Sequence, residues 1–303
     1  MAALTERRNP KTAAIDLASA LEIVDLINAE DRTVAEAVHA QREAIAAAMS
    51  TAEQVIRAGG RLFHVGAGTS GRLGVLDASE IPPTFGAPPE LVQGIIAGGP
   101  AALTRSQEGA EDRPEGARDD LDMAGVRAGD FVIGIAASGT TPYVRAALQH
   151  AKKLGARTAI IACSPPPADT LAAADIAIVV LTGPEVVTGS TRMKAGTATK
   201  LVLNTITTGA MIRLGKTYGN LMVDLQASNA KLRDRAERIV CEVCGVPADG
   251  ARDLLRAADG SVKLAIVMQK LNVDAAGART ALENEGGVIR RVVKGPPPPV
   301  EES

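Results

Sequence analysis

Three short segments of the chain combine glycine with serine or threonine, a composition suited to holding a phosphate group. They span residues 66–71, 137–142 and 188–194, and each stands just before a segment with a helical pattern. The N-terminus of a helix presents unpaired N–H groups and the positive end of the helix dipole, and short hydroxyl side chains add further donors. We therefore expect these segments to bind the phosphate of a small metabolite. The candidate ligands are Thr69, Ser70, Ser138, Thr140, Thr141, Ser190 and Thr191.

Two other interpretations of these segments are open. Serine and threonine are common N-cap residues, so any single segment can be a helix start and nothing more. Residues 66–71 also match the dinucleotide-binding pattern G-x-G-x-x-G, which requires an acidic residue near the end of the following strand. The next apolar run, Leu91–Ala97, leads into Gly98-Gly99-Pro100 and offers no such acid. Three segments of this kind in one domain favour phosphate binding over both alternatives.

Charged residues near these segments are candidates for further chemistry. Glu80 ends the sequence Asp-Ala-Ser-Glu, and Glu111 lies in the acidic sequence Glu-Gly-Ala-Glu-Asp. On the residues alone, each glutamate is more typical of a surface charge than of a catalytic acid. Arg72 and Lys194 follow or end phosphate-type segments, and each can pair with an anion of a substrate or with a structural carboxylate. His64 lies in an apolar run, which favours a packing role over a catalytic one.

Short apolar runs that alternate with helical stretches must position these residues. The runs are Arg61–Val65, Leu91–Ala97, Phe131–Ala136, Thr158–Ala162 and Ile176–Leu181. Continuous apolar strands separated by helices, clearest at Pro142–Leu154, are typical of a parallel sheet covered on both faces. The sequence therefore predicts an α/β fold with a doubly wound parallel sheet. The phosphate segments would lie at the carboxyl ends of the strands, which is the edge where such sheets bind ligands.

Helical patterns flank this region on both sides. In residues 13–59, an apolar face opens the first helix, and Asp31 or Thr33 is a candidate cap for a second helix that ends at Arg57. The residues of that face are Leu17, Leu21, Val24 and Leu26. A long helix is expected from about Arg192 to Leu214.

The strand signal disappears after Asn220. Residues 220–244 have the pattern of one amphipathic helix, and three short helices are expected at Pro247–Ala258, Ser261–Leu271 and Asp274–Asn284. The proline-rich end, GPPPPVEES, is expected to be disordered. The predicted division is an N-terminal helical segment (1–59), an α/β domain (60–219), a helical subdomain (220–294) and a tail (295–303).

Composition excludes several classes of protein. The 303 residues carry 33 Lys and Arg against 35 Asp and Glu, so the basic excess typical of nucleic-acid binders is absent. No apolar run is long enough to span a bilayer, and Met1–Thr12 lacks the apolar core of a signal peptide. The three cysteines are too few for a disulfide framework, and the Cys241–Cys244 pair has no second pair to complete a metal site. We expect a cytoplasmic protein without a metal.

Long stretches of the chain resemble the N-acetylmuramic acid 6-phosphate etherases. Leu62–Gly86, with HVGAGTSGRLGVLDASEIPPTFG at its centre, resembles the signature of that family. The other matching stretches are Ile95–Asp112, Val132–Tyr143, Glu185–Thr197 and Gly219–Asp224. Together they cover nearly the whole chain from about Ile23 to Arg290.

The resemblance implies a fold and an activity. Members of the family carry a SIS (sugar isomerase) domain followed by a small helical domain similar to ubiquitin-associated folds, and they are typically homodimers. They cleave the D-lactyl ether of N-acetylmuramic acid 6-phosphate, which gives N-acetylglucosamine 6-phosphate and D-lactate in cell-wall recycling, without a cofactor. The family's catalytic acids fall on Glu80, as the proton donor to lactate, and on Glu111, as the base or the group that handles water.

Three other functions are kept as alternatives. SIS domains also occur in sugar-phosphate sensors without catalysis, although the loss of one or both glutamates would then be expected. An aldose–ketose isomerase also removes a proton next to a carbonyl, but it needs no acid for a leaving group. An NAD-dependent oxidoreductase is the third alternative, and it depends on the weak G-x-G-x-x-G match alone.

Overall fold

The computed structural model describes residues 3–225 and 230–299, and these fall into two compact units. The first unit consists of residues up to 79 together with 89–208, and the second consists of 80–88 together with residues from 209 onward. The predicted boundaries at 59/60 and 219/220 remain a prediction. Within residues 3–225 and 230–299, no helix is both long enough and apolar enough to cross a membrane.

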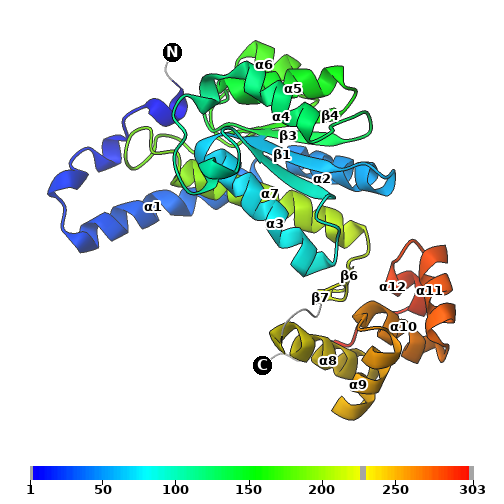
Figure 1. Cartoon of the computed structure of the whole chain (residues 1–303). Helices are drawn as coiled ribbons and strands as arrows, with labels where there is room; N and C mark the ends of the chain where they lie inside the picture. The colour runs from blue at the N-terminus through cyan, green and yellow to red at the C-terminus, as the bar shows by residue number, and fades with distance from the viewer. Residues whose placement is uncertain (1–2, 226–229, 300–303) are drawn as a thin grey trace. The chain divides into compact units, whose positions relative to one another are not determined.

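A five-stranded parallel sheet forms the centre of the first unit (Figure 1). Its strands are β1 (Leu62–Gly66), β2 (Val92–Ile96), β3 (Phe131–Ile135), β4 (Arg157–Ala162) and β5 (Ile176–Val179). The order across the sheet is β2-β1-β3-β4-β5, with all neighbours parallel. The five predicted strands are thus confirmed within one or two residues at their ends. Strands β1 and β3 are buried along their whole length, which explains why their sequences are apolar apart from His64.

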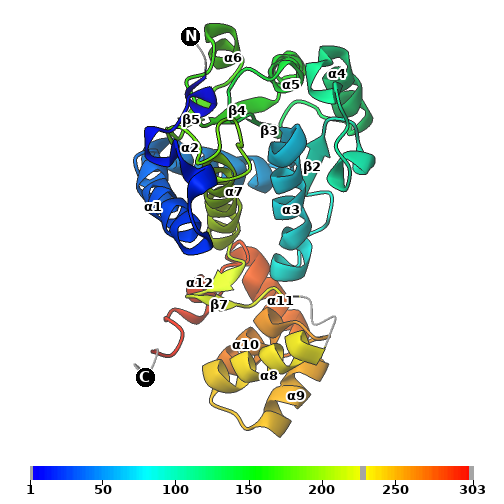
Figure 2. The same ribbon diagram turned by 90° about the vertical axis from the view of Figure 1, so that its left-hand side faces the viewer.

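Helices cover both faces of the sheet, so the predicted doubly wound α/β fold is confirmed. On one face, α5 (Pro142–Lys153) packs on β3 and β4, and α4 (Pro114–Met123) and α6 (Ala168–Ala172) pack beside it (Figure 1). On the other face lie α2 (Arg42–Arg57), α3 (Gly68–Phe85) and α7 (Lys194–Arg213) (Figure 2). The helix that follows β1 and the helix that follows β3 are therefore on opposite faces.

The sequence of α5 shows why this helix forms where it does. Pro142 occupies the first turn, where its missing N–H costs nothing, and Gly155 follows the last turn with a φ of +82°. The buried side chains of α5 include Val144 and Leu148, which are four residues apart and lie against Gly134 of β3, so they form an apolar stripe against the sheet. The N-terminus of α5 is thereby fixed at the carboxyl end of β3.

The N-terminal segment differs in detail from the prediction. Three short 3-10 turns, η1 (Leu4–Glu6), η2 (Pro10–Thr12) and η3 (Ile15–Leu17), precede one long helix, α1 (Ala20–His39). A capping box between Ser19 and Glu22 starts that helix. The expectation that Asp31 or Thr33 caps a second helix is wrong, because both lie inside α1.

The second unit is helical, with a small hairpin at its start. Strands β6 (Thr217–Tyr218) and β7 (Leu221–Met222) pair antiparallel, so the expected helix over 220–244 is wrong for its first residues. Residues 226–229 lie outside the described residues. The helices are α8 (Ala230–Cys244), α9 (Ala248–Ala257), α10 (Val262–Leu271), α11 (Ala275–Asn284) and α12 (Ile289–Val293).

The three short helices predicted for this unit are confirmed as α9, α10 and α11, and α12 was not predicted. Residues 295–299 have no regular structure. They do contact the hairpin, because the Tyr218 hydroxyl donates to the Gly295 carbonyl at 2.9 Å. The last residues, 300–303, lie outside the described part.

Helix α3 approaches β2 so closely that only glycine fits between them. A Cβ on Gly94 would lie 2.5 Å from the Cα of Val75. We expect Gly94→Ala to lower the free energy of unfolding by about 1–3 kcal/mol, because the sheet and α3 must separate. In contrast, Gly116→Ala in α4 should raise it by about 0.5–1 kcal/mol, because a Cβ there has space and alanine favours the helix. Urea unfolding of both variants measures these two changes in the free energy of unfolding. Equal changes for Gly94→Ala and Gly116→Ala would contradict the close approach of α3 to β2.

Candidate functional site

The carboxyl ends of β1 and β3 form the point from which the site is built. These two strands are neighbours, and the helices that follow them leave to opposite faces of the sheet. In doubly wound sheets, this arrangement leaves a crevice outside the strand ends, where ligands bind. The first two glycine and hydroxyl segments, 66–71 and 137–142, follow these same two strands.

Close packing explains the glycines of the first segment. A Cβ on Gly66 would lie 2.7 Å from the backbone nitrogen of Gly71, and a Cβ on Gly71 would meet the Gly66 carbonyl at the same distance. Gly68 begins α3 with a φ of +53°. The turn therefore brings the N-terminus of α3, with Thr69 and Ser70, directly onto the end of β1.

The second segment forms a compact turn between β3 and α5. The hydroxyl groups of Ser138 and Thr140 lie 2.9 Å apart, and the Thr140 N–H donates to Ser138 Oγ at 3.2 Å. Gly139 has a φ of +74°, and its backbone lies against Pro166. Thr141 is the N-cap residue of α5, yet its hydroxyl makes no capping hydrogen bond. The interpretation of Thr141 as a simple helix cap is therefore not supported.

The third segment leads into α7, which a buried carboxylate caps. The backbone N–H groups of Lys194 and Ala195 donate to the Glu185 carboxylate at 3.0 and 2.9 Å. Burial raises the pKa of Glu185 above its ordinary value, although these two donors favour its charged form. A Cβ on Gly196 would lie 3.8 Å from Thr69 Cγ2 and 3.5 Å from the Thr191 carbonyl. The start of α7 thus meets the start of α3, which brings the first and third segments together.

Lys194 is held by a structural ion pair. Its ammonium group donates to Glu30 of α1 at 2.6 Å, and its side chain is only 2% exposed. Glu30 also accepts hydrogen bonds from Lys11 and Asn9. Of the two interpretations open for Lys194, this geometry favours the structural carboxylate over direct contact with a substrate. Sequence reasoning missed Glu30, because 164 residues separate the pair.

Glu111 and Arg72 line one cavity at the same edge of the sheet. Its volume is about 240 Å³, and it lies between the start of α3 and the chain that follows β2. Its lining residues are Ala67, Gly68, Arg72, Ala97, Ala102, Ser106, Gln107, Glu108, Gly109, Ala110 and Glu111. The predicted base and one of the predicted cations are thereby brought together, although they are 39 positions apart in sequence.

Two short 3-10 turns shape the wall of this cavity. They are η4 (Pro100–Leu103) and η5 (Ala110–Asp112), which carries Glu111. Gly98, with a φ of +84°, lets the chain fold back, because a Cβ there would lie 2.9 Å from the Cβ of Gln107. On the opposite wall, Nε of Arg72 donates to the Leu103 carbonyl at 3.1 Å.

Glu80 lies elsewhere on the chain, exposed on α3 and in the second unit. It is ten residues after Ser70 on the same helix, nearly three helical turns away. The helix continues through Pro82 and Pro83 to Phe85. A proline φ fits a helix, and the Gly86 N–H still reaches the Pro82 carbonyl at 2.9 Å.

His64 is buried between the sheet and the helices, as predicted. Its Nε2 lies 3.0 Å from Asp77 Oδ2, and the other oxygen of Asp77 accepts from Asn204 and Thr207 of α7. Burial raises the pKa of Asp77, but the partners, above all His64, outweigh it and hold the pKa below its ordinary value. This network fixes α3 and α7 against β1. Among the described residues, no group of three or more His, Cys, Asp or Glu side chains is arranged to hold a metal.

Comparison with known proteins assigns the fold first. Residues 43–152 match the family model of the glucokinase regulatory protein N-terminal SIS domain. A phosphoheptose isomerase from Francisella tularensis has the same fold, with a TM-score of 0.50 and 16% sequence identity. That alignment covers 64% of this chain and 100% of the isomerase. The chain therefore contains a SIS domain.

Comparison of the whole chain assigns the family. An N-acetylmuramic acid 6-phosphate etherase from Mycolicibacterium smegmatis is 52% identical over 95% of this chain and 97% of that protein. One from Rhodopirellula baltica is 52% identical over 96% of each chain, and one from Symbiobacterium thermophilum is 58% identical over 87% of each. The chain belongs to the N-acetylmuramic acid 6-phosphate etherase family.

The ion pair of Glu30 and Lys194 is expected to contribute strongly to stability. Glu30→Gln leaves the Lys194 ammonium buried without a counter-charge, and we expect a loss of about 3–5 kcal/mol in the free energy of unfolding. The matched control is Glu115→Gln, which breaks the exposed pair with Arg113 and should cost less than about 1 kcal/mol. Urea unfolding measures both, and similar small losses would contradict the assignment.

The same pair predicts a pH dependence. Burial raises the pKa of Glu30, but hydrogen bonds from Lys194 and Lys11 outweigh it and lower the pKa from 4.5 to about 2. Because the pKa is lower in the folded state, this stabilisation is complete above pH 4.5 and is lost as the pH falls toward 2. The difference in unfolding free energy between the wild type and Glu30→Gln should therefore be constant at neutral pH and narrow below about pH 4.5.

Proposed function

We infer that this chain cleaves the lactyl ether of N-acetylmuramic acid 6-phosphate, giving N-acetylglucosamine 6-phosphate and D-lactate in peptidoglycan recycling. Membership of the etherase family carries this inference, since the similarity extends over 95% of the chain. The cavity that joins Glu111 and Arg72 at the carboxyl edge of the sheet supports it independently. The reaction belongs to the carbon–oxygen lyases.

The chemistry of the substrate defines what the site must do. An alkyl ether resists direct hydrolysis, but the lactyl ether is at C3 and the open-chain sugar has an aldehyde at C1. The proton on C2 is therefore acidic. A base removes that proton, the C3–O bond breaks, and an acid protonates the lactyl oxygen as it leaves. Water then adds to C3 of the unsaturated aldehyde, so substrate and water together give the two products.

We assign the base to Glu111 and the acid to Glu80. The reaction requires one carboxylate to act as general base and another group to act as general acid. Glu111 lines the cavity with Arg72, Glu80 is on α3, and both side chains are exposed. The family resemblance supplies the role of each glutamate.

We assign the phosphate to the hydroxyl segments at the ends of β1 and β3 and at the start of α7. Support comes from the helix N-termini there and from the hydroxyl groups of Ser138 and Thr140, which face one another at 2.9 Å. Thr69, Ser70, Thr141, Ser190 and Thr191 complete this phosphate cradle, the set of seven hydroxyl residues. Lys194 supports it through Glu30 rather than by contact.

A non-catalytic sugar-phosphate sensor is the second candidate. The match of residues 43–152 to the SIS domain of a regulatory protein is the observation in its favour. The match is shorter than the similarity to the etherases, and both glutamates are present, so the etherase is favoured.

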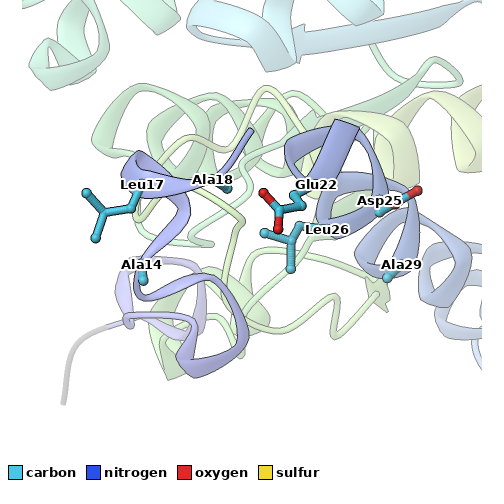
Figure 3. Close-up of a pocket in the computed structure, with 7 residues that line it drawn as sticks. All are labelled: Ala14, Leu17, Ala18, Glu22, Asp25, Leu26 and Ala29. Carbon is cyan, nitrogen blue, oxygen red and sulfur yellow. The ribbon is translucent and has the colours of Figure 1, made fainter. Parts of the chain in front are cut away.

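The functional form is proposed to be a homodimer. Leu17, Leu21 and Val24, in η3 and the first turns of α1, are 84%, 71% and 51% exposed. Leu17 also lines an open hollow of about 610 Å³ with Leu26 of α1, and Figure 3 shows that the lining comes from the residues around η3 and from α1. Adjacent exposed leucines in one segment are typical of a protein interface, and in a two-fold dimer the same surface of each copy is used.

A cytoplasmic location belongs to the same proposal. All three cysteines, Cys163, Cys241 and Cys244, are free thiols, which is the usual state in the cytoplasm.

The catalytic assignment predicts the effect of one substitution. Wild-type protein should release D-lactate from N-acetylmuramic acid 6-phosphate and none from the unphosphorylated sugar. Glu80→Gln should lower kcat by about 10²–10⁴-fold, because the leaving oxygen loses its proton donor, while the variant still folds and binds the substrate. A coupled D-lactate assay measures this, with exposed Glu90→Gln as the control that keeps full activity. Binding of the sugar phosphate without lactate release by the wild type would make the protein a sensor.

The dimer proposal predicts a change of mass. Replacing Leu17 and Leu21 together by Asp should convert the dimer to a monomer in sedimentation equilibrium, because two charges would be buried in the interface. Met123→Asp, at an apolar residue that is 82% exposed on α4, is the control that should leave the dimer intact. A monomeric wild type, or a double variant that still dimerises, would contradict this interface.

A further inference from the structure

Arg72 is the single cationic side chain among the described residues that line the Glu111 cavity. Its Nε is occupied by the Leu103 carbonyl, so the rest of the guanidinium group is available to a ligand. Within residues 3–225 and 230–299, no carboxylate forms an ion pair with it, although Glu108 and Glu111 line the same cavity. Arg72 is therefore oriented by a backbone carbonyl and, among the described residues, is not engaged in a close ion pair.

The proposed substrate has two anionic groups, and the site offers two different environments for them. The phosphate cradle consists of hydroxyl groups and helix N-termini at the ends of β1 and β3 and at the start of α7. Arg72 instead reaches over the end of β2 to Leu103, in the cavity with the proposed base. The group that leaves during the reaction is lactate, and its carboxylate must lie near the reacting carbons. A guanidinium group pairs with a planar carboxylate through two parallel hydrogen bonds.

We propose that Arg72 binds the lactyl carboxylate and makes the site selective for the sugar that carries it. This inference rests on the proposed function and assigns a role that the phosphate loops do not have. Without Arg72, the lactyl carboxylate would lie beside Glu111 and Glu108 with only acidic charges around it. Arg72 therefore determines substrate specificity, and it anchors the part of the substrate that departs.

The test compares binding of substrate and product, because only the substrate carries the lactyl group. Isothermal titration calorimetry would measure the binding of N-acetylmuramic acid 6-phosphate to the Glu80→Gln variant and to the double variant that carries both Glu80→Gln and Arg72→Met. N-acetylglucosamine 6-phosphate would be measured on the wild type and on Arg72→Met. We expect Arg72→Met to raise the Kd of the substrate by about 10- to 100-fold, as for a lost charge-assisted pair. The Kd of the product should change by less than about twofold.

Ser138→Ala is the matched control, because loss of a phosphate ligand should weaken substrate and product equally. Arg72→Lys keeps a positive charge but loses the planar guanidinium group. It should therefore weaken substrate binding less than Arg72→Met does and leave product binding unchanged. If Arg72→Met lowers the affinity for both sugars equally, Arg72 binds the phosphate, and the proposal is overturned. No loss for either sugar would leave Arg72 as an anchor of the Leu103 turn, which also overturns it. Failure of the proposed function itself would look different, because the wild type would then release no D-lactate.

Discussion

The parallel pairing of β1 with β3 is the constraint on which the site depends. All five strands of the sheet run in one direction, so every segment that follows a strand emerges at the same edge. The helices after β1 and β3 leave to opposite faces, so neither covers the strand ends between them. The hydroxyl segments that follow β1 and β3 therefore emerge at the same edge from neighbouring strands, and their positions follow from the order of the strands.

Buried charges then hold the edge in place. Glu185 caps the start of α7, and Lys194 in the first turn of that helix is fixed by Glu30 of α1. On the neighbouring side, the Asp77 network ties α3 and α7 to β1. The carboxylates of Glu185, Glu30 and Asp77 and the ammonium group of Lys194 are costly to bury alone, but each accepts or donates hydrogen bonds within these clusters. The N-terminal helix is therefore part of the support of the site, although it contributes none of the proposed ligands.

The sequence was sufficient for the sheet and for the short C-terminal helices, because apolar runs and helical spacing are local patterns. Two local signals were present but overlooked. Ser19 with Glu22 is a capping box that starts α1, and Gly219-Asn220 is a typical hairpin turn between β6 and β7. Other features were beyond the sequence. The pairing of Lys194 with Glu30, and the meeting of Arg72 with Glu111, depend on tertiary contacts between distant segments. Residue type predicted that Lys194 would pair with a carboxylate or an anion, and only the fold decides between them.

The amino-acid composition of the chain limits how the site can recognise a sugar. With 2% aromatic residues and no tryptophan, the chain has few rings on which a sugar can stack. Recognition must then come from hydrogen bonds and charge, and a substrate with two anionic groups suits such a site. Neutral donors at helix N-termini hold a phosphate without adding cations. In the proposed site, Arg72, the one arginine among the described residues that line the cavity, discriminates by position, because it pairs with a carboxylate only where the lactyl group would lie. On this proposal Arg72 offsets the charge of the ligand, so the lactyl carboxylate and the carboxylate of Glu111 can share one cavity.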